Sequence, residues 1–123
     1  MATYNGGKYV KKQIESILSQ LGTDDELIVS DDSSSDDTGS IVRSFLDERI
    51  AFLQGNAYHS PIYNFENALK HSRGDYVFLA DQDDIWHESK VATVVPLLHR
   101  YDLVVSDCII IDESENVIHP SYF

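Results

Sequence analysis

Hydrophobic positions recur along the chain with two spacings, one typical of helices and the other of strands. In residues 8–21 the apolar side chains repeat every three or four positions, which predicts a helix with one buried face. The same spacing predicts helices over residues 38–47, 63–72 and 87–98. Pro96 is expected to kink or shorten the last of them, because proline has no backbone N–H to donate.

Short apolar runs between these helices predict strands. Residues 2–7 read as the end of a strand followed by a glycine turn. Residues 26–30 and 50–53 are the first two complete strands. Residues 76–80 form an unbroken apolar run after a Gly-Asp turn, which predicts a third, buried strand. Later strand-like segments are residues 103–106, 108–111 and 117–118, the last two forming a hairpin across a polar turn at 112–116.

Alternation of strands and helices predicts an α/β fold, with a mostly parallel sheet flanked by helices. A chain of 123 residues fits a single domain, residues 1–123. In sheets of this kind ligands bind outside the carboxyl ends of the strands. Polar or acidic residues follow three of the expected strands, at residues 3–5, 31–32 and 81–84. We therefore expect these three segments to meet at one edge of the sheet and form a binding site.

The most acidic of these segments suggests a divalent cation. Asp81, Asp83 and Asp84 place three carboxylates within four residues, and such charges repel each other unless a cation lies nearby. Mg²⁺ and Mn²⁺ prefer oxygen ligands and bind through one or two carboxylates plus substrate phosphates. A solvated acidic turn is the alternative for so short a motif. A calcium loop starting at Asp31 or Asp32 is excluded, because the required glycine and glutamate are missing.

Composition narrows the partners. The formal net charge is −12, which argues against binding to nucleic-acid backbones or anionic membrane surfaces. A nucleotide remains compatible, because a divalent ion can bridge carboxylates and phosphates. The single cysteine, Cys108, lies in an apolar run and is expected to be buried. One cysteine provides no disulfide framework, which favours a reducing, cytoplasmic compartment, and no apolar run approaches the length of a membrane span.

Four short motifs follow one another along nearly the whole chain. They are Thr3-Tyr4-Asn5-Gly6, the acidic segment 27–38, Asn64-Phe65 with residues 72–76, and Asp81-Gln82-Asp83 with residues 84–86. In this order they resemble the family 2 glycosyltransferases of the GT-A fold. The last two motifs are most similar to bacterial rhamnosyltransferase-like members, which build surface polysaccharides.

The resemblance implies a donor, a metal and an acceptor. The donor would be a dTDP- or UDP-sugar, with rhamnose as a candidate sugar. The acceptor would be a saccharide or a lipid-linked saccharide, reached from the cytoplasm or from the inner face of the membrane. Mn²⁺ or Mg²⁺ would neutralise the charge that builds on the diphosphate leaving group.

The same resemblance assigns residues to these roles. Nucleotide-binding roles fall on Thr3, Tyr4, Asn5, Asp32, Asp81 and Gln82. Tyr4 would stack on the pyrimidine, and Asp32 would accept a hydrogen bond from its N3–H. Asp83, together with Asp81, would bind the metal that bridges the diphosphate. For Tyr4, a packed surface aromatic is the structural alternative.

Four other residues have simpler expected roles. Asp31 is expected to act mainly as a cap or to support a neighbouring residue of the site, and Asp84 to cap the loop that starts the next helix. Asp107 is expected to lie in a plain turn at the end of a strand. Trp86 is expected to anchor packing and not to contact sugar.

Two departures from the family pattern shape the expected activity. The acceptor half, which carries the general base in inverting members, would follow Phe123, so no catalytic base is assigned in this chain. Most of the family's first strand would precede Met1. We therefore expect a fragment, or a gene product with a misplaced start, that binds a nucleotide but does not transfer sugar unaided. An incompletely paired sheet would also favour self-association through exposed strand edges.

Three alternatives remain open from the sequence. A phosphoreceiver domain has a similar length and acidic strand ends, but it needs a lysine after a late strand and no lysine follows Lys90. A nucleotidyltransferase also uses paired carboxylates, but Gly6-Gly7-Lys8 is only a faint counterpart of its phosphate loop. A non-catalytic module that binds a nucleotide or a metal is the third.

Overall fold

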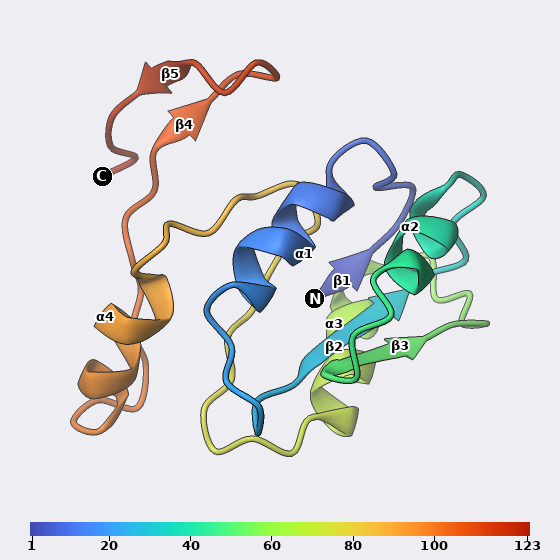
Figure 1. Cartoon of the computed structure of the whole chain (residues 1–123), viewed down its shortest axis with the longest axis horizontal. Coiled ribbons are helices and arrows are strands. Elements are labelled where there is room, and N and C mark those ends of the chain that lie inside the picture. Colours follow the sequence, from blue (N-terminus) through green and yellow to red (C-terminus); the bar gives the residue numbers. More distant parts are fainter. The chain divides into compact units, whose positions relative to one another are not determined.

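Three short parallel strands form the sheet that positions the site. They are β1 (Ala2–Thr3), β2 (Leu27–Asp31) and β3 (Ile50–Leu53), in the order β1-β2-β3, and Figure 1 shows them with β2 in the middle. The computed structural model describes residues 1–123. The chain forms two units, Met1–Thr93 and Val94–Phe123, and the sheet lies in the first.

Helices cover both faces of this sheet. Neighbouring residues of β2 point to opposite sides, so each face presents side chains that need a partner. Leu27 and Val29 belong to a core cluster with apolar side chains of α1 (Val10–Leu18) and α2 (Thr38–Ser44). On the other face, Ser30 accepts a hydrogen bond from Asn67 of α3 (Pro61–His71) at 2.9 Å. In Figure 1, α3 lies behind β2 and α2 lies in front of it. The sheet is therefore buried on both sides, as expected for parallel strands.

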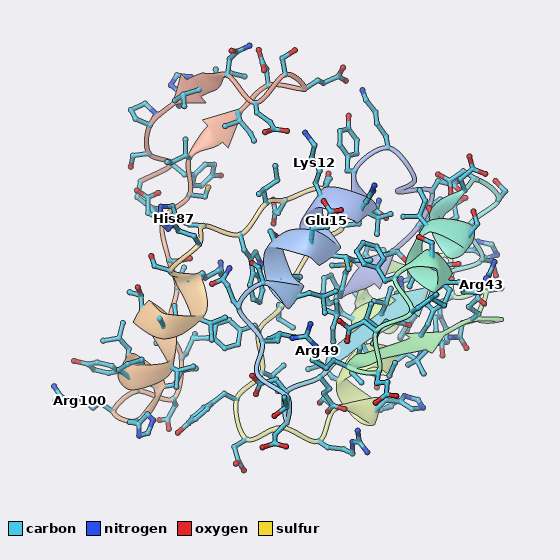
Figure 2. The ribbon with its side chains drawn as sticks, viewed as in Figure 1. Lys12, Glu15, Arg43, Arg49, His87 and Arg100 are labelled. Carbon is cyan, nitrogen blue, oxygen red and sulfur yellow. The ribbon has the colours of Figure 1, made fainter.

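The first helix is amphipathic, as its spacing predicts. Ile14 and Ile17 are buried in the core, whereas Lys12 and Glu15 lie on the outer face of the helix (Figure 2). The helix begins at Val10, two residues later than expected, because the carbonyl of Gly6 accepts hydrogen bonds from the backbone N–H groups of Tyr9 and Val10 in a preceding turn.

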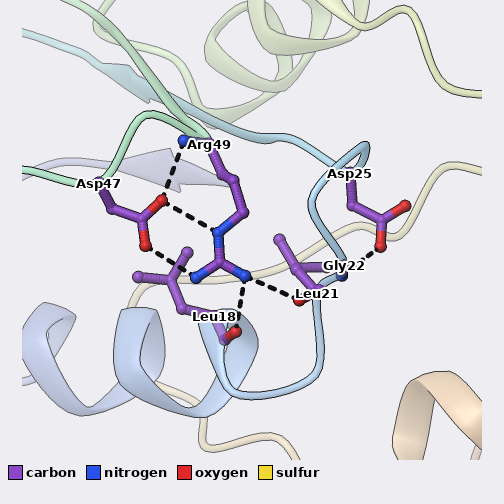
Figure 3. A network of polar contacts seen from close by, with 6 residues as sticks. All are labelled: Leu18, Leu21, Gly22, Asp25, Asp47 and Arg49. Carbon is purple, nitrogen blue, oxygen red and sulfur yellow. Dashed lines mark hydrogen bonds and ion pairs between the residues drawn. The ribbon is translucent and has the colours of Figure 1, made fainter.

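A charged side chain closes the other end of α1 (Figure 3). Arg49, just before β3, donates hydrogen bonds to the backbone carbonyls of Leu18 and Leu21, at 3.1 and 2.7 Å. Its remaining donors bind the carboxylate of Asp47, with an N–O distance of 2.7 Å for the ion pair. Carbonyls at a helix end have no partner within the helix, so this arginine satisfies them and links α1 to the strand β3.

The expected strand at residues 76–80 is wrong. This segment has no regular secondary structure and belongs to no sheet, and Val77 and Leu79 are 47% and 63% exposed. Phe78 instead packs against Trp86, with ring centroids 5.4 Å apart. An apolar run becomes a strand only where a neighbouring strand offers a backbone ladder, and the sheet here ends at β1. Trp86 is buried, which agrees with its expected role as a packing anchor.

The second unit is smaller and contains a hairpin. It holds most of α4 (Lys90–Leu98), followed by β4 (Ile110–Ile111) and β5 (Val117–His119), which pair antiparallel. The hairpin agrees with the sequence prediction. The expected strand at residues 103–106 does not form, and Cys108 is exposed, so both predictions are wrong. Pro96 lies within α4, which continues to Leu98.

No helix in the structure is both long enough and apolar enough to cross a membrane.

Candidate functional site

The loop after β1 is fixed by hydrogen bonds to the loop after β2. Thr3, which is buried, donates from its hydroxyl to the carboxylate of Asp31 at 2.8 Å. The backbone N–H of Asn5 donates to the hydroxyl of Ser34 at 2.8 Å, and the side-chain oxygen of Asn5 accepts from the N–H of Ser35 at 2.9 Å. Asn5 adopts a positive φ of 50°, a conformation that asparagine tolerates better than most residues. These bonds hold the two strand ends together.

Asp31 and Asp32 face different partners. Asp31 accepts hydrogen bonds from the backbone N–H and the hydroxyl of Ser34, at 2.9 and 2.6 Å, and so caps its own loop as expected. Asp32 is also buried, and its two carboxylate oxygens accept backbone N–H groups of Tyr58 and Ser60. Asp32 therefore orders the start of α3 as well as facing the site.

The third segment, residues 81–84, and the residues that follow it up to Val91 are supported by polar side chains of α1 and of the turn after it. Three hydrogen bonds run between α1, with the turn after it, and this part of the chain. Gln13 donates to the carbonyl of Asp81 at 3.0 Å, and the hydroxyl of Ser16 accepts the N–H of Trp86 at 3.0 Å. The side-chain oxygen of Gln20 accepts the N–H of Val91, also at 3.0 Å. Gln13 is completely buried, so this support is part of the core.

Carboxylates crowd at this segment. Partial burial, followed by the charges of Asp81 and Asp83, raises the pKa of Asp84 above its ordinary value, while Lys90 acts in the opposite direction. Burial is the larger cause, and the neighbouring carboxylates add to it, because both disfavour the ionised form of a carboxyl group. The expected cap role of Asp84 stays a prediction.

These loops enclose a pocket of about 400 Å³. Five of the six residues with predicted nucleotide-binding roles line it, together with Asp83; they are Thr3, Tyr4, Asp32, Asp81 and Gln82. Asn5 is the exception, since it ties the two loops together beside the pocket. Asp32 and Asp83 thus share one cavity, although they lie 51 positions apart in the sequence.

The remaining wall of the pocket comes from residues that sequence reasoning did not assign to the site. They are Ala2, His59, Ser60, Pro61, Asn64 and Phe65. His59 has a positive φ of 49°, which is uncommon for a residue other than glycine. In the sequence analysis, Asn64-Phe65 was noted only as part of a family motif. The signal that could have assigned it to the site is its position, because it follows a loop that returns to the carboxyl edge of the sheet.

Asn64 has an unusual environment. Its side chain is 2% exposed, and its Nδ2 group donates to the carbonyl of Thr3 at 3.1 Å. Its Oδ1 atom is buried and has no hydrogen-bond partner. Since most buried polar atoms are hydrogen-bonded, an unpaired acceptor in the wall of a pocket favours a site that a polar ligand completes.

Comparison with known proteins identifies the family. The model of the family described as "Glycosyl transferase family 2" matches residues 1–123. The chain belongs to glycosyl transferase family 2. The family expected from the sequence motifs is therefore confirmed.

Curated relatives of this family 2 chain act on lipid-linked saccharides or activated sugars, according to their names. A UDP-Glc:alpha-D-GlcNAc-diphosphoundecaprenol beta-1,3-glucosyltransferase of Escherichia coli is 34% identical over 77% of this chain and 38% of its own length. The dTDP-rhamnosyl transferase RfbG of Shigella flexneri is 33% identical over 80% of this chain and 36% of its own. A GalNAc(5)-diNAcBac-PP-undecaprenol beta-1,3-glucosyltransferase of Campylobacter jejuni is 37% identical over 88% and 36%. This chain spans less than two fifths of each.

A solved structure confirms the fold. Residues 1–349 of S. aureus TarS superpose on this family 2 chain with a TM-score of 0.69 and 26% identity, covering 82% of this chain and 31% of TarS. The α/β fold of the GT-A type, with a parallel sheet flanked by helices, agrees with the sequence prediction. Membership of family 2 also removes the phosphoreceiver and nucleotidyltransferase alternatives.

Proposed function

We propose that this chain provides the donor-binding part of a bacterial glycosyltransferase, which transfers a sugar from a nucleotide-diphosphate donor to a growing surface polysaccharide or lipid-linked saccharide. The observation that carries the proposal is the pocket shared by Asp32, Tyr4 and the segment with Asp81 and Asp83. An aromatic side chain suits a base, and carboxylates with a cation suit a diphosphate. Two of the named relatives carry UDP or dTDP donors in their names, which supports a pyrimidine nucleotide.

The geometry supports specific roles for three residues. Tyr4 is 54% exposed at the pocket and offers a ring on which a pyrimidine can stack. Asp32 keeps acceptor capacity beyond its two backbone partners, because a carboxylate has about four lone-pair sites, and so can accept the imide N–H of uracil or thymine. Asn64 also lines the pocket, and its buried Oδ1 has no partner within the protein, so a small shift of this side chain would offer a further acceptor. Rhamnose stays a candidate sugar because of the likeness to RfbG.

The acidic segment suits a divalent cation that also needs phosphate ligands. No group of three or more His, Cys, Asp or Glu side chains is arranged to hold a metal ion by itself. Mg²⁺ and Mn²⁺ typically bind through one or two carboxylates, with phosphate oxygens and water completing the coordination. Asp81 and Asp83 fit this donor set, and the cation would neutralise negative charge on the diphosphate.

Calorimetry with UDP and dTDP, each with and without Mn²⁺, tests the proposal. We expect binding that requires Mn²⁺ and that weakens at least about tenfold in Asp83→Ala, because each lost carboxylate ligand weakens the metal site. Asp75→Ala is the matched control, since Asp75 is also exposed but does not line the pocket. It should bind like the wild type, and ADP should bind more weakly than UDP.

Two outcomes would contradict the proposal. If the wild-type chain binds neither UDP nor dTDP at millimolar concentration with Mn²⁺, it is not a donor-binding domain. If Asp83→Ala binds as tightly as the wild type, the metal is held elsewhere.

A further inference from the structure

The side-chain amide of Gln82 forms two hydrogen bonds with the backbone of Tyr4. The N–H of Tyr4 donates to Oε1 of Gln82 at 2.8 Å, and Nε2 of Gln82 donates to the carbonyl of Tyr4 at 3.0 Å. An amide that pairs with both backbone groups of one residue copies the pairing of two strands, and therefore fixes the position and the rotation of that residue. The two residues are 78 positions apart in the sequence.

The packing around this amide leaves no spare room. A Cβ atom added at Gly6 would lie 2.2 Å from Oε1 of Gln82 and 2.5 Å from its Cδ. Contacts under 3.0 Å essentially never occur, so a side chain at this position would push the amide away from Tyr4. The backbone of Gly6 is itself held, because its N–H donates to the hydroxyl of Thr38 at 2.8 Å. Gly6 thus permits the pairing of Gln82 with Tyr4.

The position of Gln82 gives this pairing a functional meaning. Gln82 lies between Asp81 and Asp83, the residues assigned to the cation, while Tyr4 is the residue assigned to the base. All four line the same pocket. Since Tyr4 as a whole is 54% exposed, few side-chain contacts constrain it, and the bonds to its backbone set where its ring lies relative to the carboxylates.

We propose that Gln82 is a positioning residue that holds the base-binding loop at a fixed separation from the diphosphate-binding loop. This inference rests on the proposed function. A nucleoside diphosphate bridges the two loops, so its affinity depends on how well their separation matches the ligand. Pyrophosphate contacts only one of the loops, so its affinity does not. When one ligand binds two linked elements at once, its affinity falls if the distance between the elements no longer matches the ligand.

The experiment compares two ligands at one Mn²⁺ concentration, UDP and inorganic pyrophosphate, by calorimetry. Gln82→Ala should bind UDP about tenfold more weakly, the loss expected for hydrogen bonds of this kind, and pyrophosphate within about twofold of the wild type. Gln54→Ala is the matched control. Its side-chain amide also forms a hydrogen bond, accepting from Arg43, but it lies outside the pocket, and its loss should leave both affinities unchanged.

A second variant disrupts the pairing of Gln82 with Tyr4 by a change at Gly6. Gly6→Ala should weaken UDP binding selectively, because its methyl group displaces the Gln82 amide. The double variant Gly6→Ala with Gln82→Ala should bind UDP no more weakly than Gln82→Ala alone, because the clash is then gone. Circular dichroism establishes that each variant is folded.

Three results would overturn the inference. Undiminished UDP binding in Gln82→Ala would show that the pairing does not matter while leaving the proposed function intact. Equal losses of UDP and pyrophosphate affinity would show that Gln82 serves only the acidic loop. Failure of the wild-type chain to bind UDP and dTDP with Mn²⁺ would overturn the proposed function, and this inference with it.

Discussion

Asp31 and Asp32 show how two adjacent carboxylates acquire separate roles. Side chains in an extended chain alternate in direction, so Asp31 turns back to Thr3 and Ser34 while Asp32 receives backbone N–H groups of the segment before α3. Asp31 is therefore a structural residue of the site, and Asp32 is the one that faces the pocket. Different roles for the two residues were expected from the sequence, but the role of Asp32 came only from the family resemblance and stays a prediction.

Replacing Asp31 should destabilise the fold without changing the pocket lining. In Asp31→Ala the buried hydroxyl of Thr3 keeps only the more distant carbonyl of Ser30, at 3.4 Å, as an acceptor. Ser34 loses the acceptor of both its hydroxyl and its backbone N–H. We expect the free energy of unfolding to fall by about 1.5–3 kcal/mol, the usual worth of hydrogen bonds to a charged group. Urea denaturation followed by fluorescence of the single tryptophan measures it.

Asp37→Ala is the control for that measurement. Asp37 occupies the N-cap of α2 but makes no side-chain capping bond, so its loss should cost far less. Equal stability of the Asp31→Ala variant and the wild type would show that water replaces the lost acceptor.

Individual residues also show where sequence reasoning fails. Trp86 was predicted to be a packing anchor, and it is buried against Phe78. This prediction did not depend on the strand expected before it, which does not form. Cys108 was predicted to be buried and is exposed. The apolar run around it suggested a strand, but only Ile110–Ile111 pairs with a neighbour, and burial requires a partner that composition does not specify.

At the scale of elements, the link between α1 and β3 depends on an ion pair. The hydrogen bonds from Arg49 lower the pKa of Asp47 to about 2, and Asp47 in turn raises the pKa of Arg49. A carboxyl group whose pKa is lower in the folded state stabilises the fold at pH values above its unfolded pKa. That contribution is lost as the pH falls from about 4 to about 2.

This ion pair predicts a specific acid sensitivity. Asp47→Asn should lower stability at pH 7, and its stability should fall less than that of the wild type between pH 4 and pH 2, because the titrating group is gone. Urea unfolding midpoints at pH 2, 3, 4 and 7 give the comparison. Glu48→Gln, a change at the exposed neighbouring residue, should follow the wild-type profile. Parallel profiles for Asp47→Asn and the wild type would contradict the assignment.

Elements were predictable where the pattern and the pairing agreed. Residues 50–53 were predicted as a strand and form β3 with the same bounds, because they lie beside β2 in register. Residues 76–80 have a stronger apolar pattern, yet they form no strand. A pattern of side chains reports burial, whereas a strand also needs backbone partners, and these depend on the arrangement of the whole sheet.

At the scale of the whole molecule, the sequence predicted the α/β topology and the meeting of three polar segments at one edge. These followed from the order of elements and from the rule for parallel sheets. The pairing of Gln82 with Tyr4 and the wall from His59 to Phe65 were not predictable, because both depend on distances between segments that are far apart in the sequence. Local spacing has no information about such contacts.

The net charge of −12 predicts a stability that rises with salt. Self-repulsion opposes the compact state, and raising the ionic strength from 0.01 to 0.1 M shortens the screening length from about 30 to about 10 Å. We expect the melting temperature at pH 7 to rise by roughly a few degrees over this range of NaCl. A variant with Asp24→Asn and Asp75→Asn, two exposed positions, should show a smaller rise. A melting temperature that falls with salt would show that attractive pairs dominate.

Three hydrogen bonds join Gln13, Ser16 and Gln20 to residues 81–91. They limit how this protein can be engineered. Chimeras that exchange residues 81–91 between related enzymes, in order to alter donor choice, would separate that stretch from its scaffold. The foreign stretch would then lack matching anchors and shift out of place. Exchanges should therefore carry the supporting side of α1 along with the acidic residues.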